Sequence, residues 1–286
     1  MQAARFDSQR FAGKQRAIRI LVLRRVYTRR VFDPQDLRLC AKRIFLVVLM
    51  GASYASAAPS PSALTRSRQL LIVTTSDWNS VAGTLQRYER RGADEPWVKV
   101  GDMIPVVVGK GGMGWGDGVV AVPGHAATDP VKHEGDGRTP AGIFGVGTTF
   151  GYAPDKPAGW AMPYRALTPA TDCVDDRDSK HYNQIIERTG GELDWKSAEH
   201  MRSEGVYYQW GAVIEQNPQG RPGDGSCVFL HVSDDSGQGT AGCTAMAKPE
   251  LGTALGWLKP GADPLVVEMP IAEYRRAAKA LRLPSQ

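Results

Sequence analysis

The amino-acid sequence predicts a mainly β fold in a single domain, either a sandwich or a closed sheet, with a few short helices at its edge. Apolar and β-branched runs are short and lie between turn-forming residues, and the chain holds 32 glycines and 19 prolines. Only the stretches 195–202, 248–257 and 272–281 have helical periodicity. No internal repeat and no second composition regime follow residue 68, so one domain is the economical interpretation.

The predicted strands begin at residue 69 and follow one another closely. The β-rich run 69–75 is the first strand, and 83–90 can close a hairpin with it. Short strands are expected at 97–101 and 104–109. A further strand begins where the turn-rich segment 132–144 ends, because its last residues are apolar.

Two polar segments are expected to be loops. Residues 109–118 hold six glycines but no GxxxxGK[ST] pattern, so we interpret them as a turn and loop rather than a phosphate site. Residues 173–202 are polar, with four aspartates between 172 and 178. This spacing lacks the central glycine and the last glutamate of an EF-hand calcium loop, so a solvated loop is the better interpretation.

The positive charge of the chain is concentrated at its N-terminus. The net charge is +5, and residues 1–57 hold 12 of the 35 basic and 3 of the 30 acidic residues. Residues 58–286 are left with 23 basic and 27 acidic residues, a net charge of −4. This balance argues against nucleic acid as a partner of the main domain.

The N-terminal segment has the pattern of a secretory signal. Lys42 and Arg43 precede the apolar run 44–50, and small residues follow up to Ala57, after which we expect cleavage. The apolar run is shorter than the roughly 20 residues of a membrane span, so an uncut anchor is the less favoured alternative.

Three parts of the chain are therefore expected. Residues 1–57 form a basic leader and secretory signal, and the stretch 1–39 is longer than such a signal needs. Residues 58–68 form a linker and residues 69–286 the folded domain. No lipid-attachment cysteine follows the apolar run, so the mature protein is expected to be free, with no stable membrane span.

Removal of the leader takes away Cys40 and leaves Cys173, Cys227 and Cys243. An odd number of cysteines in an oxidising compartment implies one free thiol or an intermolecular bridge. If Cys243 is the free thiol, Cys173 and Cys227 can form a disulfide or stay as two buried thiols.

His231 and Cys243 are candidates for nucleophilic thiol chemistry. Alternation along the strand that contains Cys227, Phe229 and His231 puts these three on one face, with His231 at the strand's end. The loop to Cys243 contains Gly237 and other glycines, so it can bring a thiol and its base together. Packing in the core is the structural alternative for both residues.

The turn at 240–243 offers donors for an oxyanion. Gly242 tolerates any φ, so the amides of Gly242, Cys243 and Thr244 can converge near the sulfur. A helix at 251–257 with its N-terminal end near this turn would lower the pKa of the thiol.

Two separated segments resemble the L,D-transpeptidase catalytic domain, the YkuD-like family of cell-wall enzymes. They are His231 with 240–243 (TAGC), and 134–144 (EGDGRTPAGIF), and the resemblance covers most of 68–270. It implies a single β-sandwich-like domain in which Cys243 is the nucleophile and His231 the general base. It also implies that Gly242 and the Cys243 amide form the oxyanion turn.

The resemblance implies an activity as well. The cysteine attacks the peptide bond after the L-centre of diaminopimelate in a peptidoglycan stem peptide and releases D-Ala. An amine of a neighbouring stem then resolves the acyl-enzyme and forms a 3–3 cross-link.

Two positions depart from the family's pattern. Ala241 stands where many members have histidine, and Ala245 stands where many have arginine. Arg138, Arg165 or Arg177 would then have to supply the charge for a substrate carboxylate. The expected substrate-binding side chains are Arg138, Tyr182 and Trp210.

The sequence thus predicts a periplasmic or cell-wall-associated transferase of peptidoglycan biosynthesis, acting in cell-wall organisation and cell shape, with stem peptides as partners and no cofactor. A hydrolase that uses the same Cys/His pair and a non-catalytic wall-binding module are the alternatives. A metalloenzyme ranks last and no metal is expected, because the five histidines show no HExxH or CxxC spacing.

Overall fold

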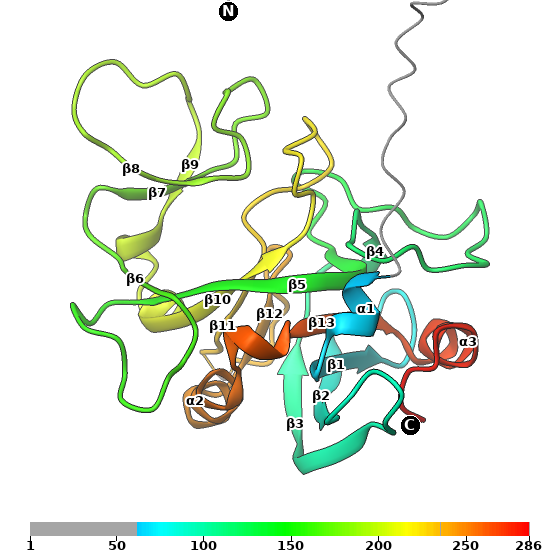
Figure 1. Ribbon diagram of the computed structural model, residues 1–286. Coiled ribbons are helices and arrows are strands. Elements are labelled where there is room, and N and C mark those ends of the chain that lie inside the picture. Colours follow the sequence, from blue (N-terminus) through cyan, green and yellow to red (C-terminus); the bar gives the residue numbers. More distant parts are fainter. Residues whose placement is uncertain (1–61, 235, 286) are drawn as a thin grey trace, which may run out of the picture. The chain divides into compact units, whose positions relative to one another are not determined.

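The computed structural model describes residues 62–234 and 236–285 (Figure 1). The expected signal, its cleavage site and Cys40 lie outside the described residues. The described part of the expected linker begins with the short helix α1 (Ser62–Arg66), whose Ala63 and Leu64 pack against the core. Among the residues described, no helix combines the length and the apolar character needed to cross a bilayer.

The main sheet closes on itself. In the described part of the chain its strand order is β10-β11-β12-β3-β2-β1-β13-β5, and β10 also pairs with β5, which completes a ring of eight strands. The mainly β prediction is confirmed, and the main sheet is closed rather than divided into two facing sheets. The ring strands are β1 (Gln69–Thr75), β2 (Ala82–Glu89), β3 (Val98–Val107), β5 (Thr139–Gly151), β10 (Trp210–Glu215), β11 (Phe229–Val232), β12 (Thr244–Met246) and β13 (Leu265–Pro270).

Two short strands extend the sheet, β4 (Met113–Trp115) and β6 (Tyr164–Ala166), and both pair with β5. The sequence predicted β1 and β2 closely, whereas the two strands expected between 97 and 109 are the single strand β3. The stretch 109–118, expected as a loop, contains β4.

The core lies where strands are apolar on both faces. β1 pairs in parallel with β13, and all residues of both strands are buried. Two-sided burial explains why these strands are continuous apolar runs rather than alternating ones. Helix α3 (Ile271–Leu281) contacts both strands and buries Tyr274 against them.

The second helix, α2 (Lys248–Trp257), packs against β10 and β11. The predicted helices at 248–257 and 272–281 are therefore confirmed. The remaining helical turns are short 3-10 helices: η2 (Met201–Ser203), η3 (Tyr207–Gln209) and η4 (Pro260–Ala262).

The segment 173–202 is not the solvated loop that its polarity predicted. It contributes to a three-stranded antiparallel sheet of β7 (Thr171–Val174), β8 (Ile185–Glu187) and β9 (Ala198–His200). The helix predicted at 195–202 is also wrong, because β9 and η2 occupy this stretch.

Asp172, directly before this segment, is fully buried in β7. Its carboxylate lies 2.8 Å from Nδ1 of His200 and 3.4 Å from Nε of Arg188. A charge can be buried when such partners replace water, so the polar composition of the segment does not mean that it is solvated.

Cys173 of β7 and Cys227, which precedes β11, form a disulfide, and Cys243 is a free thiol. Of the two alternatives for this pair, the structure has the disulfide. The bridge ties the three-stranded sheet to the closed sheet.

Reduction of this disulfide is expected to lower the free energy of unfolding by about 4 kcal/mol, by the loop-entropy relation for a long closed loop. The bridged cysteines are 54 residues apart. Urea unfolding with and without reductant measures the loss. A Cys173→Ala/Cys227→Ala variant should show a similar loss and no response to reductant. Equal stability of the oxidised and reduced protein would contradict the prediction.

Candidate functional site

Neighbouring parallel strands bring His231 and Cys243 together. In the register of β11 and β12, Leu230 pairs with Thr244 and His231 with Ala245. Cys243 therefore lies at the start of β12, beside Phe229, whose backbone N–H donates to the Cys243 sulfur at 3.3 Å.

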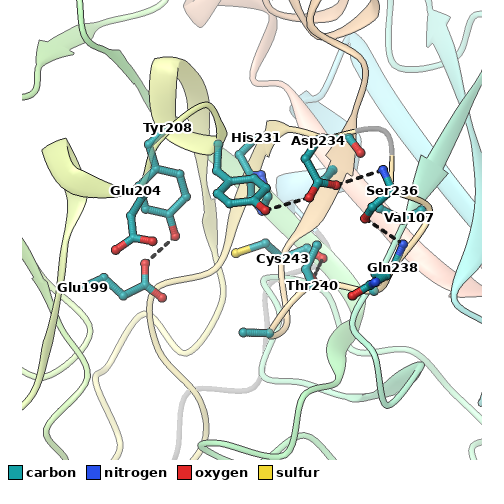
Figure 2. A pocket seen from close by; sticks show the side chains of 15 residues that line it. Val107, Glu199, Glu204, Tyr208, His231, Asp234, Ser236, Gln238, Thr240 and Cys243 are labelled. Atoms are coloured by element: carbon teal, nitrogen blue, oxygen red, sulfur yellow. Dashed lines mark hydrogen bonds between the residues drawn. The ribbon is translucent and has the colours of Figure 1, made fainter.

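One cavity of about 320 Å³ is lined by both Cys243 and His231 (Figure 2). Its other walls come from β9, η3 and the loop that joins β11 to β12. The closed sheet thus supplies the thiol and the imidazole, and the three-stranded sheet with its following turn supplies the opposite wall.

His231 is 6% exposed and held as a neutral base. Its Nδ1 lies 2.8 Å from the carbonyl oxygen of Val232. A carbonyl oxygen only accepts, so Nδ1 carries the proton and Nε2 keeps its lone pair. Burial lowers the pKa of His231 to about 4, against smaller opposing effects of Val232 and Asp234. The imidazole is therefore neutral at neutral pH and able to take a proton.

Cys243 is also 6% exposed, and burial raises the pKa of its thiol. The Glu199 carboxyl raises it further, whereas the Phe229 N–H and Lys132 act in the opposite direction. The expectation that α2 would lower this pKa is wrong, because desolvation of the sulfur dominates. The resting cavity thus holds a neutral imidazole and a neutral thiol, and the thiol donates to the carbonyl oxygen of Cys227 at 3.5 Å.

The upstream segment 134–144 lies against the cysteine turn. The Thr139 hydroxyl donates to the carbonyl oxygen of Cys243 at 3.0 Å and accepts from the N–H of Gly109 at 2.9 Å. The Thr240 hydroxyl donates to the same Cys243 oxygen at 2.6 Å. The two segments that carry the family resemblance therefore meet at Cys243.

The turn itself depends on Gly242, which has φ +155°. A Cβ added there would lie 3.1 Å from the carbonyl oxygen of Arg138. The N–H of Gly242 donates to Oγ1 of Thr240 at 3.1 Å, so one of the three expected oxyanion donors is engaged within the turn. Thr244, the next residue after Cys243, is fully buried as the first residue of β12.

The expected substrate-binding residues lie elsewhere. The Arg138 guanidinium donates to backbone carbonyl oxygens of Trp78 and Met113. Tyr182 is 3% exposed, and its hydroxyl donates to a carboxylate at 2.5 Å. Trp210 is partly buried, with a lysine ammonium 4.6 Å from its ring centroid. These three residues are not among those that line the cavity at Cys243.

The cavity is also lined by residues that the sequence analysis did not identify. Glu199 of β9 accepts a hydrogen bond from the Tyr208 hydroxyl, and the Tyr208 ring packs edge-on against His231 at 5.6 Å. The Tyr207 hydroxyl donates to Asp234 at 2.8 Å, and its ring lies 5.9 Å from His231. The adjacent tyrosines in a polar segment were the only sequence signal for this wall.

No group of three or more histidine, cysteine, aspartate or glutamate side chains is placed to hold a metal ion within 62–234 and 236–285.

Glu268 of β13 is a buried acid beneath the cysteine turn. It is fully buried and accepts a hydrogen bond from the Thr244 hydroxyl at 2.5 Å, while its Oε2 has no partner. Burial raises its pKa from the ordinary value of 4.5 to about 8. The folded protein therefore holds Glu268 protonated at neutral pH.

The raised pKa of Glu268 makes stability depend on pH. The folded state binds the Glu268 proton more tightly than the unfolded state. Its contribution to the free energy of unfolding is therefore complete below pH 4.5 and is lost as the pH rises to about 8. Between these values the free energy of unfolding should fall by at most about 1.4 kcal/mol per pH unit.

Glu268→Gln should remove this part of the slope. Unfolding curves of the parent protein and of the variant are measured from pH 5 to pH 9. The difference between the two pH profiles is the test, because Glu199 also has a raised pKa and contributes to the pH dependence of both proteins. Parallel pH profiles for the two proteins would contradict it.

Comparisons with known proteins identify no family. No protein-family model and no curated protein matches the chain. Among solved structures, the chain is similar to Bd1075 of Bdellovibrio bacteriovorus, with 14% sequence identity and a TM-score of 0.35. The alignment covers 76% of this chain and 55% of that one, so this chain spans about half the length of its structural neighbour. A likeness at this level supports no assignment.

Proposed function

We propose that the protein is an exported cysteine acyltransferase of the L,D-transpeptidase type that acts on peptidoglycan stem peptides in the periplasm or cell wall. One observation carries the proposal: a single cavity holds the free thiol of Cys243 and the neutral imidazole of His231. The contact of Thr139 with the Cys243 carbonyl supports it, because it joins the two segments of the family resemblance.

The first half of the proposed reaction forms a thioester. The Cys243 sulfur attacks the carbonyl carbon of the stem peptide bond, and Nε2 of His231 takes the thiol proton as the carbon–sulfur bond forms. The amides of Cys243 and Thr244 are the candidate donors to the oxyanion, since the Gly242 N–H donates to Thr240. The carbon–nitrogen bond then breaks, and His231 returns the proton to the departing amine of D-Ala.

The second half transfers the acyl group. An amine of a neighbouring stem attacks the thioester, His231 accepts a proton from that amine, and the proton returns to the Cys243 sulfur as it leaves. Since both groups are neutral at rest, each proton transfer accompanies bond formation rather than preceding it.

Product analysis tests the proposal. The purified protein is incubated with stem tetrapeptide, and released D-Ala and peptide products are measured by mass spectrometry. We expect D-Ala with a cross-linked dimer, and neither product with Cys243→Ala. Free tripeptide in place of dimer would identify water as the acceptor, which is the hydrolase alternative. Binding of the stem without D-Ala release by a folded protein would contradict acyl transfer and support a wall-binding module.

A further inference from the structure

The cavity at Cys243 is lined by carboxylic acids and by no lysine or arginine. Three of the described residues in its walls are carboxylic acids, Glu199, Glu204 and Asp234, and none is lysine or arginine. Ala245 also belongs to the wall, at the position where the family resemblance leads one to expect an arginine. A ligand that enters this cavity therefore meets carboxyl groups, and no lysine or arginine, beside the thiol.

The three acids differ in the hydrogen bonds that their carboxyl groups accept. Asp234 accepts from the Tyr207 hydroxyl and from the N–H of Ser236, so its oxygens are occupied at the rim. Glu199 accepts from Tyr208 through one oxygen, and the structure gives its other oxygen no hydrogen bond. The Glu204 carboxylate has no hydrogen bond among the described residues. Glu199 and Glu204 are the acids with acceptor oxygens available to a ligand.

The cavity is a built site and not only an acidic cluster. His231 is more than nine-tenths buried, lines the same cavity, and has no partner for its Nε2 in the described part of the chain. In Figure 2 the Cys243 sulfur points to the side of the cavity that carries Glu199, Glu204 and Tyr208. The acids and the reactive pair therefore face one shared space.

We propose that Glu199 and Glu204 determine specificity by binding a protonated primary amine of the ligand beside Cys243. The ligand class is a peptide or amine with a cationic amino group near the reacting carbonyl, and a free carboxylate at this place is disfavoured. An ammonium in the cavity favours the ionised form of Glu199 and forms charge-assisted hydrogen bonds with both acids, whereas a ligand carboxylate finds no cationic partner there. As a statement about substrates, the inference rests on the proposed acyl transfer.

The surroundings of Glu199 fit this role. Burial raises its pKa to about 8, the Tyr208 hydroxyl opposes this change, and Glu204, Asp175 and Glu134 add to it. Glu199 is therefore largely protonated in the empty cavity at neutral pH, and the acidic neighbours that disfavour its ionisation favour a cation beside it. The Tyr208 hydroxyl also fixes one carboxyl oxygen, which leaves the other oriented for the ligand.

Charge-selective thiol reagents test the inference without any peptide substrate. Three methanethiosulfonates with the same ethyl spacer carry an ammonium, a hydroxyl or a sulfonate, and each transfers its thioethyl group to a cysteine. The rate of Cys243 modification is followed by mass spectrometry at pH 7.5 and low salt. The other two described cysteines are protected in their disulfide.

We expect the ammonium-to-sulfonate rate ratio of Cys243 to exceed that of a small neutral thiol by roughly tenfold or more, since a charged cavity concentrates the opposite charge. Glu199→Gln and Glu204→Gln should each lower this ratio, and the rate of the hydroxyl reagent serves as the reference for any change in the reactivity of the thiol itself. Glu192→Gln is the matched control, because Glu192 is exposed and outside the cavity.

A ratio equal to that of the small thiol, or a ratio unchanged in both variants, would overturn the inference. No reaction with any reagent would also overturn it, because the cavity would then not admit the cation. Unfolding curves of each variant verify that the fold is kept. The outcome is separable from the proposed function, because the charge preference can hold in a protein that releases no D-Ala, and can fail in one that does.

Discussion

Replacing His231 by glutamine is expected to lower the rate of acyl-enzyme formation by about 10²–10⁴-fold, the usual contribution of a general base. The Cys243 thiol has a raised pKa and is neutral at rest, so attack requires a group that takes its proton. His231 has a free Nε2 in the same cavity. Glutamine keeps a polar group of similar size but cannot act as a base at neutral pH.

The measurement is the initial rate of D-Ala release under saturating stem tetrapeptide, with Cys243 intact by mass. His125→Gln is the matched control, because His125 is exposed and lies outside the cavity. Its rate should equal that of the parent protein. A His231→Gln variant that folds normally and keeps most of its rate would show that this histidine is not the base.

Gly242→Ala is expected to cost about 1–3 kcal/mol of folding stability and to abolish most of the acylation rate. The backbone at Gly242 has φ +155°, which alanine rarely adopts, and the added Cβ would press on the Arg138 carbonyl. Relief requires the turn to shift, and that turn carries Cys243. Urea unfolding and D-Ala release measure the two effects.

Gly261→Ala is the matched control for this variant. A Cβ at Gly261 meets nothing within 4 Å, and its φ is not in the positive region. Its stability should stay near that of the parent protein, with activity unchanged. A Gly242→Ala protein with the stability and rate of this control would contradict the role given to the turn.

The sequence allowed the pairing of His231 and Cys243 to be predicted because its signals are local. The sequence places His231 near the end of an apolar strand, β11 in the structure, and a glycine-rich loop leads from there to Cys243. Adjacent parallel strands are enough to place both residues at one cavity, and β11 and β12 supply them. The helices α2 and α3 were predictable for the same reason, since helical periodicity is read within one segment.

The opposite wall of the cavity could not be predicted in this way. The strands β8 and β9 have three residues each, which is too short for alternation to show. Their position depends on pairing with β7 and on the disulfide to Cys227, both of which are long-range contacts. Glu199 therefore gave no signal, and the adjacent Tyr207 and Tyr208 did not show which wall they form.

The pKa of Cys243 was mispredicted for the same physical reason. The sequence shows a nearby helix, α2, which would favour a thiolate. The burial of the sulfur depends on what packs over it, including the wall that the sequence did not reveal. Desolvation of the sulfur is the largest effect on its pKa, and the thiol is held neutral.

The mass of Cys243 after incubation with stem tetrapeptide tests the central claim most directly. Acyl transfer predicts an adduct equal to the tetrapeptide without its terminal D-Ala, located on Cys243 by peptide mapping and absent in Cys243→Ala. An unmodified Cys243 with intact tetrapeptide, in a folded protein whose thiol is reduced, would contradict it.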